Sequence, residues 1–495
     1  MNDLSQPVQL RPLLESFANR TLLVSGSTGF VAKALVAKIS GSLPTVSRII
    51  LPIRARNQGE AERRFEREIE GSSAFAALRG SSWRSRIEVL ACDLSQPDLG
   101  IDAATRATLV KEVEVVINSA ASVDFNGPVH LALAANVRAP RALLGLAREA
   151  GAPFVQVSTC FVCGLMDGEV PEALHPIPGE NLASCLAELE DASRPFFEQD
   201  DSEASTRAGR RLAKAKGFAD IYSYTKFLGE HVVNDERDGL PTVIVRPAIV
   251  ESALRDPYPG WLQGFRMLDP LILAHGEGRL RGFPVKPATV LDIIPVDFVA
   301  NAILAATARL LEGDQTFTVY QVGTSATAPL EARRIARNLE EHFAAEPLQD
   351  ERGHARTLSA IKLHDPVRYR RQVTWRYDWP LKVGSAIFGR RLPVPGTRLV
   401  RRALRRARGA LRATLKYVDT YGAYAALDVR FMTDNTRALN SALGAPDRET
   451  FDFRLGTLDW DAFLREVHIP GLLRMLREDG TLAASDAPRT TPLNS

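Results

Sequence analysis

The sequence is poor in cysteine, with only four among its 495 residues. So few cysteines cannot hold a chain of this length together, which excludes a secreted fold built on disulfides. The chain also has no run of about 18 apolar residues, so we expect no membrane-spanning helix. Its N-terminal segment lacks a basic start followed by an apolar run, as a secretory signal would require. These absences predict a reduced, cytoplasmic protein.

No charge of one sign dominates, because 62 basic residues stand against 59 acidic ones and the formal net charge is +3. The total therefore gives no reason to expect a nucleic-acid partner. Hydrophobic residues make up 45% of the chain, which is typical of globular proteins and excludes disorder of the whole chain. At roughly 100–200 residues per domain, the length predicts two to four domains.

Short β-branched runs alternate with longer stretches of helical spacing over roughly the first 330 residues. Two of the predicted helices cover Val31–Ile39 and Leu131–Arg148, where apolar residues recur every three or four positions. The predicted strands are Thr21–Val24, Arg48–Ile53, Ile87–Ala91, Val113–Asn118, Phe154–Ser158 and Thr242–Arg246. This alternation indicates an α/β fold with a Rossmann-like, doubly wound parallel sheet that binds its ligand at the carboxyl ends of the strands.

A glycine-containing turn follows the first predicted strand and precedes a helix. Its spacing is G-x-x-G-x-x-A, with Gly26, Gly29 and Ala32. Such residues allow a tight turn, close approach of the backbone to a pyrophosphate, and close packing of helix on strand. An ordinary strand–helix turn has similar residues, but the position at the first strand favours a dinucleotide. The candidate cofactor-binding residues here are Gly26, Ser27, Thr28, Gly29, Phe30 and Val31.

The second predicted strand ends in two arginines, Arg54 and Arg56, and no acid follows. Because an acid would bind the ribose 2′-hydroxyl of NAD(H), whereas arginine accommodates a 2′-phosphate, the pattern favours NADPH. The alternative is that both are solvated loop charges. Further polar or small residues follow the third and fourth strands, where the adenine and second ribose are expected. These candidates are Asp93, Leu94, Ser119, Ala120 and Ala121.

Tyr222 and Lys226 lie four residues apart on a predicted helix, so their side chains project from one face. A phenol with a pKa near 10 is a weak acid–base group at neutral pH, but a nearby ammonium favours the phenolate. The pair is therefore a candidate for proton delivery during hydride transfer, although a surface Tyr–Lys pair would have the same spacing. Thr159, at the end of the fifth strand, is the candidate donor to a developing oxyanion, unless it only caps that strand.

Cys160 and Cys163 form a single CxxC pair with no second pair and no histidine nearby. Such a pair does not make a zinc site, so we predict no metal. We expect both thiols to lie in the core or to line a pocket. A covalent acyl intermediate on Cys160 is the alternative.

In combination, these residues resemble the fatty acyl-CoA reductases of the extended short-chain dehydrogenase/reductase superfamily, and the layout is most similar to bacterial alcohol-forming members. Two of the matching stretches, Asp256–Trp261 and Asp292–Asp297, are the most specific to these reductases. The matching stretches are Gly26–Phe30, Ile117–Phe125, Val157–Phe161, Tyr222–Lys226, Arg246–Val250, Asp256–Trp261 and Asp292–Asp297. This chain departs from the family pattern at Ala32 and at Phe161–Gly164.

The resemblance implies reduction of a long-chain acyl-CoA thioester by NADPH to a fatty aldehyde and then a fatty alcohol, with release of coenzyme A. It implies a catalytic set of Thr159, Tyr222 and Lys226. It also adds Pro247 and Ile249 near the nicotinamide and Asn136 in support of the active site, all three grouped with the cofactor-binding residues. The alternatives are a reductase that stops at the aldehyde, an acyl carrier protein thioester as substrate, and another extended reductase such as a sugar-nucleotide epimerase or a hydroxysteroid-type dehydrogenase.

The predicted domains are an N-terminal extension (1–19), an NADPH-binding reductase domain (20–365), a helical C-terminal domain (366–480) that the resemblance identifies as the family's "sterile" domain, and a disordered tail (481–495). We expect residues 255–285 and the C-terminal helices to form the acyl pocket.

The segment 366–417 has fifteen basic residues and one acid. It includes a predicted basic amphipathic helix at Leu399–Val418. This segment either attracts the phosphates of coenzyme A, lies on an anionic membrane, or packs on the reductase domain with a solvated basic face.

Overall fold

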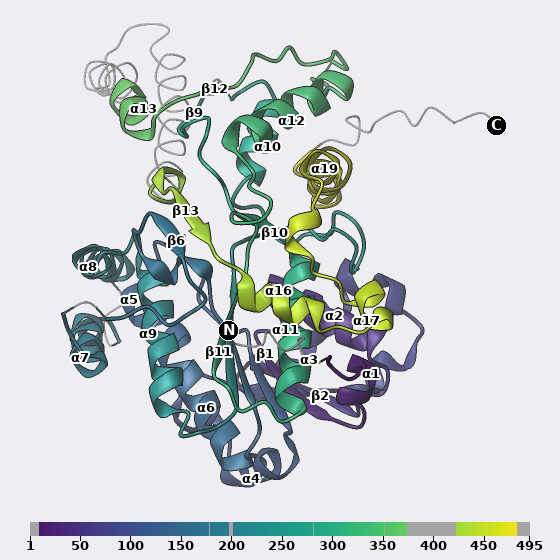
Figure 1. Ribbon diagram of the computed structural model, residues 1–495, viewed down its shortest axis with the longest axis vertical. Coiled ribbons are helices and arrows are strands. Elements are labelled where there is room, and N and C mark those ends of the chain that lie inside the picture. Colours follow the sequence, from purple (N-terminus) through teal and green to yellow (C-terminus); the bar gives the residue numbers. More distant parts are fainter. Residues whose placement is uncertain are drawn as a thin grey trace, which may run out of the picture. The chain divides into compact units, whose positions relative to one another are not determined.

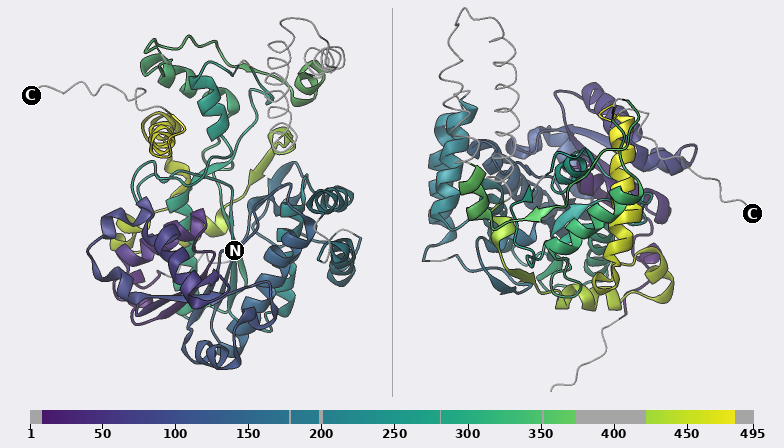
Figure 2. Two further views of the ribbon diagram at one scale, coloured as in Figure 1. Left: turned by 180° about the vertical axis from the view of Figure 1, so that it is seen from behind. Right: turned by 90° about the horizontal axis from the view of Figure 1, so that it is seen from above.

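The computed structural model describes residues 9–177, 179–197, 201–280, 282–350, 352–373 and 422–482. These residues form two compact units (Figures 1 and 2). The sheet unit consists of the described residues up to Gly264 together with Asp292–Pro329 and Val429–Leu482. The small unit consists of Phe265–Leu291 and the described part of Leu330–Asp428. Neither unit is continuous in sequence.

The described residues of the sheet unit include a seven-stranded parallel sheet with the order β11-β7-β5-β4-β1-β2-β3. Its strands are β1 (Thr21–Ser25), β2 (Arg48–Arg54), β3 (Ile87–Cys92), β4 (Val115–Asn118), β5 (Phe154–Val157), β7 (Thr242–Pro247) and β11 (Thr318–Val322). The predicted Rossmann-like fold is therefore confirmed. All six predicted strands are present, with ends that differ by at most two residues. β11, one of the two edge strands, was not predicted from the sequence.

Helices cover both faces of this sheet (Figure 1). On one side α2 (Phe30–Ser42) packs against α11 (Val296–Leu311), and on the other α6 (Ala139–Ala150) lies between α4 (Ala103–Glu112) and α9 (Ile221–Glu236). The predicted helix Leu131–Arg148 is present but interrupted, because α5 (Val129–Leu133) and α6 are joined by a π-helical turn. The apolar core between sheet and helices includes Leu23, Val116, Leu143 and Phe154.

The C-terminal segment of the sheet unit packs against earlier elements of the same unit. β13 (Val429–Phe431) pairs in parallel with β6 (Gly168–Val170), and the Phe431 side chain is fully buried. The segment 429–482 thus belongs to the sheet unit, which differs from the domain boundary at residue 366 expected from composition. The remaining elements of this unit are α1 (Leu13–Ser16), α3 (Gln58–Phe65), α7 (Leu182–Ser193), α8 (Ser202–Ala215), β8 (Ile249–Glu251), β10 (Ile293–Pro295), α16 (Asp434–Ser441), α17 (Ala445–Thr450), α18 (Trp460–Ala462) and α19 (Ile469–Glu478).

The small unit contains α10 (Asp269–Gly276), α12 (Ala332–Ala345) and α13 (Pro366–Val373), together with the pair β9 (Gly282–Phe283) and β12 (Lys362–Leu363). A small pocket between α10 and α12 has an entirely apolar lining that includes Ile272, Ile335 and Leu339. Most of the basic segment 366–417, including the predicted helix Leu399–Val418, lies outside the described residues, as does the predicted tail.

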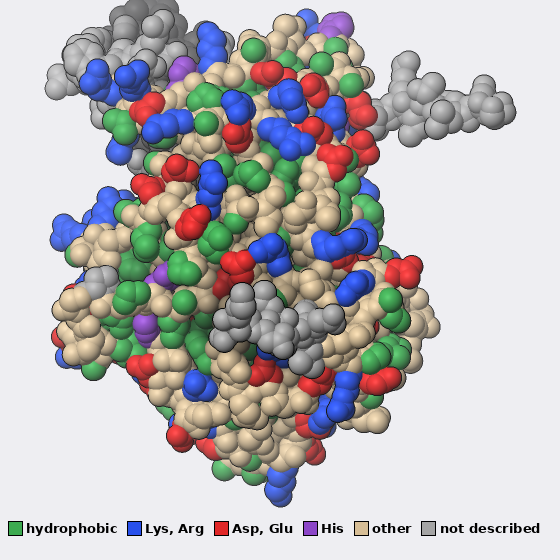
Figure 3. All heavy atoms as spheres, in the orientation of Figure 1, with side chains coloured by type: hydrophobic (Ala, Val, Ile, Leu, Met, Phe, Trp, Pro, Cys, Tyr) green, Lys and Arg blue, Asp and Glu red, His purple; other side chains and the backbone are tan. Residues whose placement is uncertain are grey.

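The described helices include none with the length and apolar character needed to cross a membrane. On the face drawn in Figure 3, basic and acidic side chains are interspersed rather than separated into regions of one sign.

Candidate cofactor and catalytic site

The glycine-containing turn has the tight geometry expected of a dinucleotide-binding turn. Gly26 has a φ of +75°, and a Cβ there would lie 2.7 Å from the backbone nitrogen of Ala120. Glycine is therefore required by both conformation and space. The amide of Gly29 donates to the carbonyl of Gly26 (2.8 Å), and α2 begins at the next residue. Because the first amides of a helix have no partners within it, the N-terminus of α2 is available to an anion.

Two buried hydroxyl groups at this edge of the sheet fit a polar ligand. Ser27 lies in the turn and Ser158 follows β5, and neither side-chain oxygen has a hydrogen-bond partner within the described part of the chain. Buried hydroxyl groups are nearly always paired, so an unpaired one requires an explanation. A bound dinucleotide would supply partners, and the residues present therefore fit such a cofactor.

The neighbouring strand ends bring the other cofactor candidates to the same edge. Arg54 ends β2 and Arg56 follows it; both side chains are exposed, and neither guanidinium forms a hydrogen bond or ion pair within the described residues. Asp93 follows β3, but its carboxylate accepts from the amide (3.0 Å) and hydroxyl (2.6 Å) of Ser95, which closes a turn that includes Leu94. Residues Ser119, Ala120 and Ala121 follow β4, whose last residue, Asn118, is in register with Ser25 of β1.

Asn136 is buried in the π-helical turn, and its amide joins two parts of the site. Its oxygen accepts from the amide of Ser122 (2.9 Å), while its nitrogen donates to the Ser122 carbonyl (3.1 Å) and to the Thr225 hydroxyl (3.0 Å). This side chain therefore links the loop after β4 to α9. The assignment of Asn136 to the cofactor-binding residues stays a prediction.

Thr159 and Tyr222 come together at the carboxyl end of β5. The Asp220 side chain caps α9 and places Tyr222 in its first turn. The Tyr222 phenol shares a side-chain hydrogen bond with Thr159, and its ring meets that of Phe125 edge-on at 5.4 Å. Burial raises the pKa of Tyr222, and the hydrogen bond to Thr159 partly opposes this rise. The phenol is therefore held in its protonated form, as a proton donor must be.

Lys226 lies one turn after Tyr222 on α9 and is 3% exposed. Its Nζ donates to the carbonyl of Val157 (2.8 Å), which fixes the ammonium at the end of β5. Burial lowers the pKa of Lys226 to about 8, and the negative charge of Glu230 opposes that decrease. Glu230 lies a further turn along the helix and forms a buried two-bond ion pair with Arg246 (2.9 and 2.6 Å).

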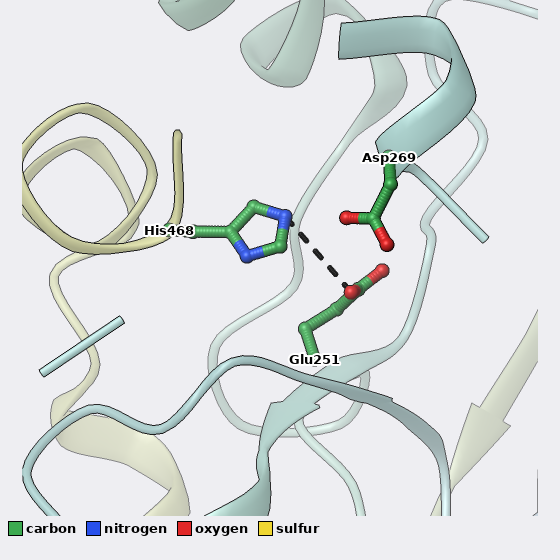
Figure 4. A group of neighbouring side chains, drawn as sticks. All are labelled: Glu251, Asp269 and His468. Atoms are coloured by element: carbon green, nitrogen blue, oxygen red, sulfur yellow. Dashed lines mark ion pairs between the residues drawn. The ribbon is translucent and has the colours of Figure 1, made fainter. Parts of the chain in front are cut away.

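Sequence reasoning missed the Glu230–Arg246 pair as part of the site. The spacing of Tyr222, Lys226 and Glu230 was a usable signal, since residues four apart share a helix face. No local pattern indicated that Arg246, which lies on β7, would pair with Glu230 of α9. A second missed pair is Glu251 and His468, both buried, whose side chains point toward one another at 3.9 Å (Figure 4). Burial lowers the pKa of His468 to about 4, so this imidazole is neutral at physiological pH.

Pro247 and Cys160 lie beside Thr159. The carbonyl of Pro247, the last residue of β7, accepts from the Thr159 hydroxyl (3.4 Å), and Ile249 begins β8. Cys160 is fully buried and donates to the carbonyl of Arg246 (3.0 Å). Burial raises the pKa of the Cys160 thiol well above its usual value and that of Cys163 to about 11. A reactive thiolate at Cys160 is thus disfavoured, and both cysteines behave as core residues.

Comparisons with known proteins agree with this arrangement. The NAD-binding family model described as male sterility protein matches residues 24–303. The chain is 30% identical to fatty acyl-CoA reductase 2, chloroplastic, of Arabidopsis thaliana, over 93% of this chain and 79% of that protein. It is 27% identical to the alcohol-forming fatty acyl-CoA reductase of Simmondsia chinensis, over 94% and 99% of the two chains. Both are plant proteins, which differs from the bacterial type expected from the layout of the chain.

Among solved structures, the fold is similar to the terminal R domain from the myxalamid PKS-NRPS biosynthetic pathway. The TM-score is 0.60 at 20% identity, and the match covers 94% of this chain and 92% of that domain. The reductase domain of a non-ribosomal peptide synthetase from Mycobacterium tuberculosis has a TM-score of 0.56 at 20% identity, over 95% and 96% of the chains. At this level of identity, these similarities support the fold alone.

Proposed function

Because the chain belongs to the fatty acyl-CoA reductase family, and is an oxidoreductase, we propose that it reduces a long-chain fatty acyl-CoA to the fatty alcohol with NADPH. The observation that supports this most directly is the grouping of Thr159, Tyr222 and Lys226 at the strand end beside the dinucleotide turn. Reduction of a thioester to a primary alcohol takes two hydrides and two protons and releases the thiol. When bound, NADPH supplies the hydrides.

The hydroxyl groups of Thr159 and Tyr222 would both donate hydrogen bonds to the substrate carbonyl oxygen. These bonds strengthen as negative charge develops on that oxygen, which lowers the barrier to reduction. After the thiol leaves, the same two groups would hold the oxygen of the aldehyde. Tyr222 then gives its proton to this oxygen, so that the product leaves as an alcohol.

Lys226 would assist this proton transfer without contacting the acyl group. Its ammonium lies one helical turn from the phenol and stabilises the phenolate that remains when Tyr222 loses its proton. The Val157 carbonyl holds the ammonium in place, and Glu230 supplies negative charge that keeps it protonated in a buried position.

The preference for NADPH over NADH rests on Arg54 and Arg56. Their guanidinium groups have no competing partners among the described residues, so they are available to a 2′-phosphate. The turn from Gly26 to Val31 would hold the pyrophosphate through its backbone amides.

The decisive experiment measures aldehyde, alcohol and free thiol together, with purified protein, palmitoyl-CoA and either NADPH or NADH. We expect two NADPH oxidised for each coenzyme A released, alcohol as the main product, and much slower reaction with NADH. A ratio of one NADPH per thiol with aldehyde as the end product would instead identify an aldehyde-forming reductase. No oxidation of NADPH with any acyl thioester would contradict the proposal.

For the basic segment 366–417, we propose attachment to anionic membranes, where acyl substrates are concentrated. The described part of this segment includes Arg368, Arg370 and Arg371 on α13. Pelleting of the protein with anionic vesicles should decrease as salt is raised, because screening weakens electrostatic attachment. Equal pelleting with neutral vesicles would contradict this proposal.

A further inference from the structure

The Asp256–Trp261 stretch lies against the dinucleotide turn. We call residues 252–263, which contain it, the Trp261 loop. The Trp261 ring, only 2% exposed, packs on the ring of Phe30 with centroids 5.1 Å apart. Nε2 of Gln263 donates to the carbonyl of Thr28 (3.2 Å). Both contacts involve residues of the turn that is expected to hold the pyrophosphate, which is a different environment from the acyl pocket expected for residues 255–285.

Hydrogen bonds within the Trp261 loop and from Asp297, in the second family-specific stretch Asp292–Asp297, maintain the conformation of this loop. The carboxylate of Asp297 accepts from the backbone amides of residues 254, 255 and 256 (2.9, 2.8 and 3.3 Å). Within the loop, the amide of Ala253 donates to the carbonyl of Trp261 (2.8 Å), and the amide of Gly260 donates to that of Ala253 (2.9 Å). Asp297 and these backbone bonds therefore present Trp261 and Gln263 to the turn.

The C-terminal segment supports the same loop. Gly471 of α19 packs so closely on Gly260 that a Cβ on Gly471 would lie 2.2 Å from the Gly260 carbonyl oxygen. Arg474 donates to the carbonyl of Pro259 (3.0 Å), with its guanidinium 5.0 Å from the centre of the Tyr258 ring. Nδ1 of His468 lies 3.0 Å from the hydroxyl of Ser252. The loop thus connects α19 to the dinucleotide turn.

One polar atom of the loop points to a ligand. The side-chain oxygen of Gln263 is buried and has no hydrogen-bond partner within the described residues. The amide nitrogen of the same side chain donates to the Thr28 carbonyl, and the oxygen, which can only accept, is left without a donor. A hydroxyl or amide group of a bound dinucleotide would satisfy it.

We propose that Trp261 and Gln263 are positioning residues for the dinucleotide: they hold the turn from Gly26 to Phe30 in the shape that receives the pyrophosphate, and α19 supports them. This inference rests on the proposed dinucleotide site. It assigns to that site two further residues that follow the turn by more than 200 positions in the sequence.

The test compares Gln263→Met and Gln263→Glu with the wild type by titrating the protein with NADPH and following the fluorescence of the cofactor. Gln263→Met removes the bond to Thr28 and should raise the dissociation constant about fivefold. Gln263→Glu also places a negative charge beside the phosphates and should raise it further. Gln263 is partly exposed, so neither change should prevent folding. The Michaelis constant for acyl-CoA at saturating NADPH should stay within about twofold.

The matched control is Asn435→Leu, which removes another side-chain amide that donates to a backbone carbonyl, that of Val319 (3.1 Å). A parallel pair compares Trp261→Phe with Trp460→Phe, since both tryptophans are buried. The proposal is supported if the variants of the Trp261 loop weaken NADPH binding more than their controls do. It is overturned if NADPH binding weakens no more in Gln263→Met than in Asn435→Leu.

A measurement on the cofactor-free protein tests directly whether Gln263 restrains the turn. Amide hydrogen exchange at residues 26–30 should be faster in Gln263→Met than in the wild type, because the turn loses a bond that restrains it. Unchanged exchange there would overturn the restraining role. A protein that binds NADPH but reduces no acyl thioester would contradict the proposed reaction and leave this test intact.

Discussion

The ammonium of Lys226 donates a 2.8 Å hydrogen bond to the backbone carbonyl of Val157, and this contact ties α9 to the carboxyl end of β5. The register of these two elements determines where the reactive groups lie. Thr159 lies two residues after Val157, and Tyr222 lies one helical turn before Lys226. The hydrogen bond between Lys226 and Val157 therefore brings the hydroxyl groups of Thr159 and Tyr222 close together. The side-chain bond between Thr159 and Tyr222 is the result.

Replacing Tyr222 by phenylalanine removes the proposed proton donor and leaves the ring in contact with Phe125. We expect the turnover number to fall by about 100-fold or more, as is usual when a positioned acid is lost. The dissociation constant for NADPH should change by less than about twofold, since the phenol is not part of the phosphate-binding turn. Steady-state kinetics and cofactor titration measure the two quantities.

Tyr224→Phe is the control for this substitution, because it removes a hydroxyl from a buried tyrosine on the same helix. It should retain near-normal turnover. Equal losses in the two variants would indicate a general effect on α9 and would contradict the assignment of Tyr222.

The proposed role of Lys226 predicts a pH dependence. Burial lowers its pKa to about 8 in the folded protein, against an ordinary value of 10.5. The ammonium is therefore present below about pH 8 and is lost as the pH rises through that value, although an exposed lysine would keep its proton there. If the cation assists Tyr222, kcat/KM should decrease above about pH 8, and a pH profile from 6 to 10 measures this.

Lys226→Arg provides the comparison, because a guanidinium keeps its charge over this whole range. Its activity should be low, since the side chain differs in shape, but the decrease near pH 8 should be absent. The role assigned to Lys226 fails if the wild-type profile is flat between pH 7 and 9, or if the arginine variant shows the same decrease.

The parts of the site that depend on local order could be predicted from the sequence. Gly26 and Gly29 follow a strand and precede a helix, and Tyr222 and Lys226 lie on one helix face; both patterns follow from the geometry of consecutive residues. The strands that are apolar along their length could be predicted for the same reason. β11 was missed although its run, Thr318–Val322, has three β-branched residues and follows a turn at Gly313, so a local signal for this strand was present.

The contacts that complete the site join distant residues, and no local pattern indicates them. Asn136 reaches Thr225, Glu230 pairs with Arg246, and Gln263 reaches Thr28 only because the sheet order brings their elements together. The family-specific stretches around Trp261 and Asp297 could be identified from the sequence. Their effect on the dinucleotide turn could not, because it depends on how the loop folds back onto that turn.

The preference for NADPH should depend on the two arginines after β2. Arg54→Gln combined with Arg56→Gln removes both candidate partners of the 2′-phosphate. The Michaelis constant for NADPH should rise by about tenfold or more, while that for NADH stays within about twofold. Arg63→Gln, which removes an exposed arginine from the nearby α3, is the control and should leave both constants unchanged. A parallel rise for NADPH and NADH in the double variant would show that these arginines do not recognise the phosphate.

The support of the Trp261 loop by α19 predicts that a substitution far from the turn in sequence weakens cofactor binding. Gly471→Ala would place a methyl group 2.2 Å from the Gly260 carbonyl oxygen, so α19 and the loop must separate. Trp261 and Gln263 would then lose their positions against Phe30 and Thr28. We expect the dissociation constant for NADPH to rise by about fivefold or more, with a smaller change in the Michaelis constant for acyl-CoA.

Gly145→Ala is the matched control, because a Cβ on this helical glycine of α6 would meet no atom within 4 Å outside the adjoining backbone of its own helix. Alanine is a better helix former than glycine, so this variant should gain about 0.5–1 kcal/mol in free energy of unfolding and bind NADPH normally. Thermal unfolding of both variants without cofactor confirms that each is folded before titration. If folded Gly471→Ala binds NADPH as tightly as Gly145→Ala, then the loop does not transmit the position of α19 to the dinucleotide turn, and the contacts of Gly471 and Arg474 serve only to hold the C-terminal segment in place.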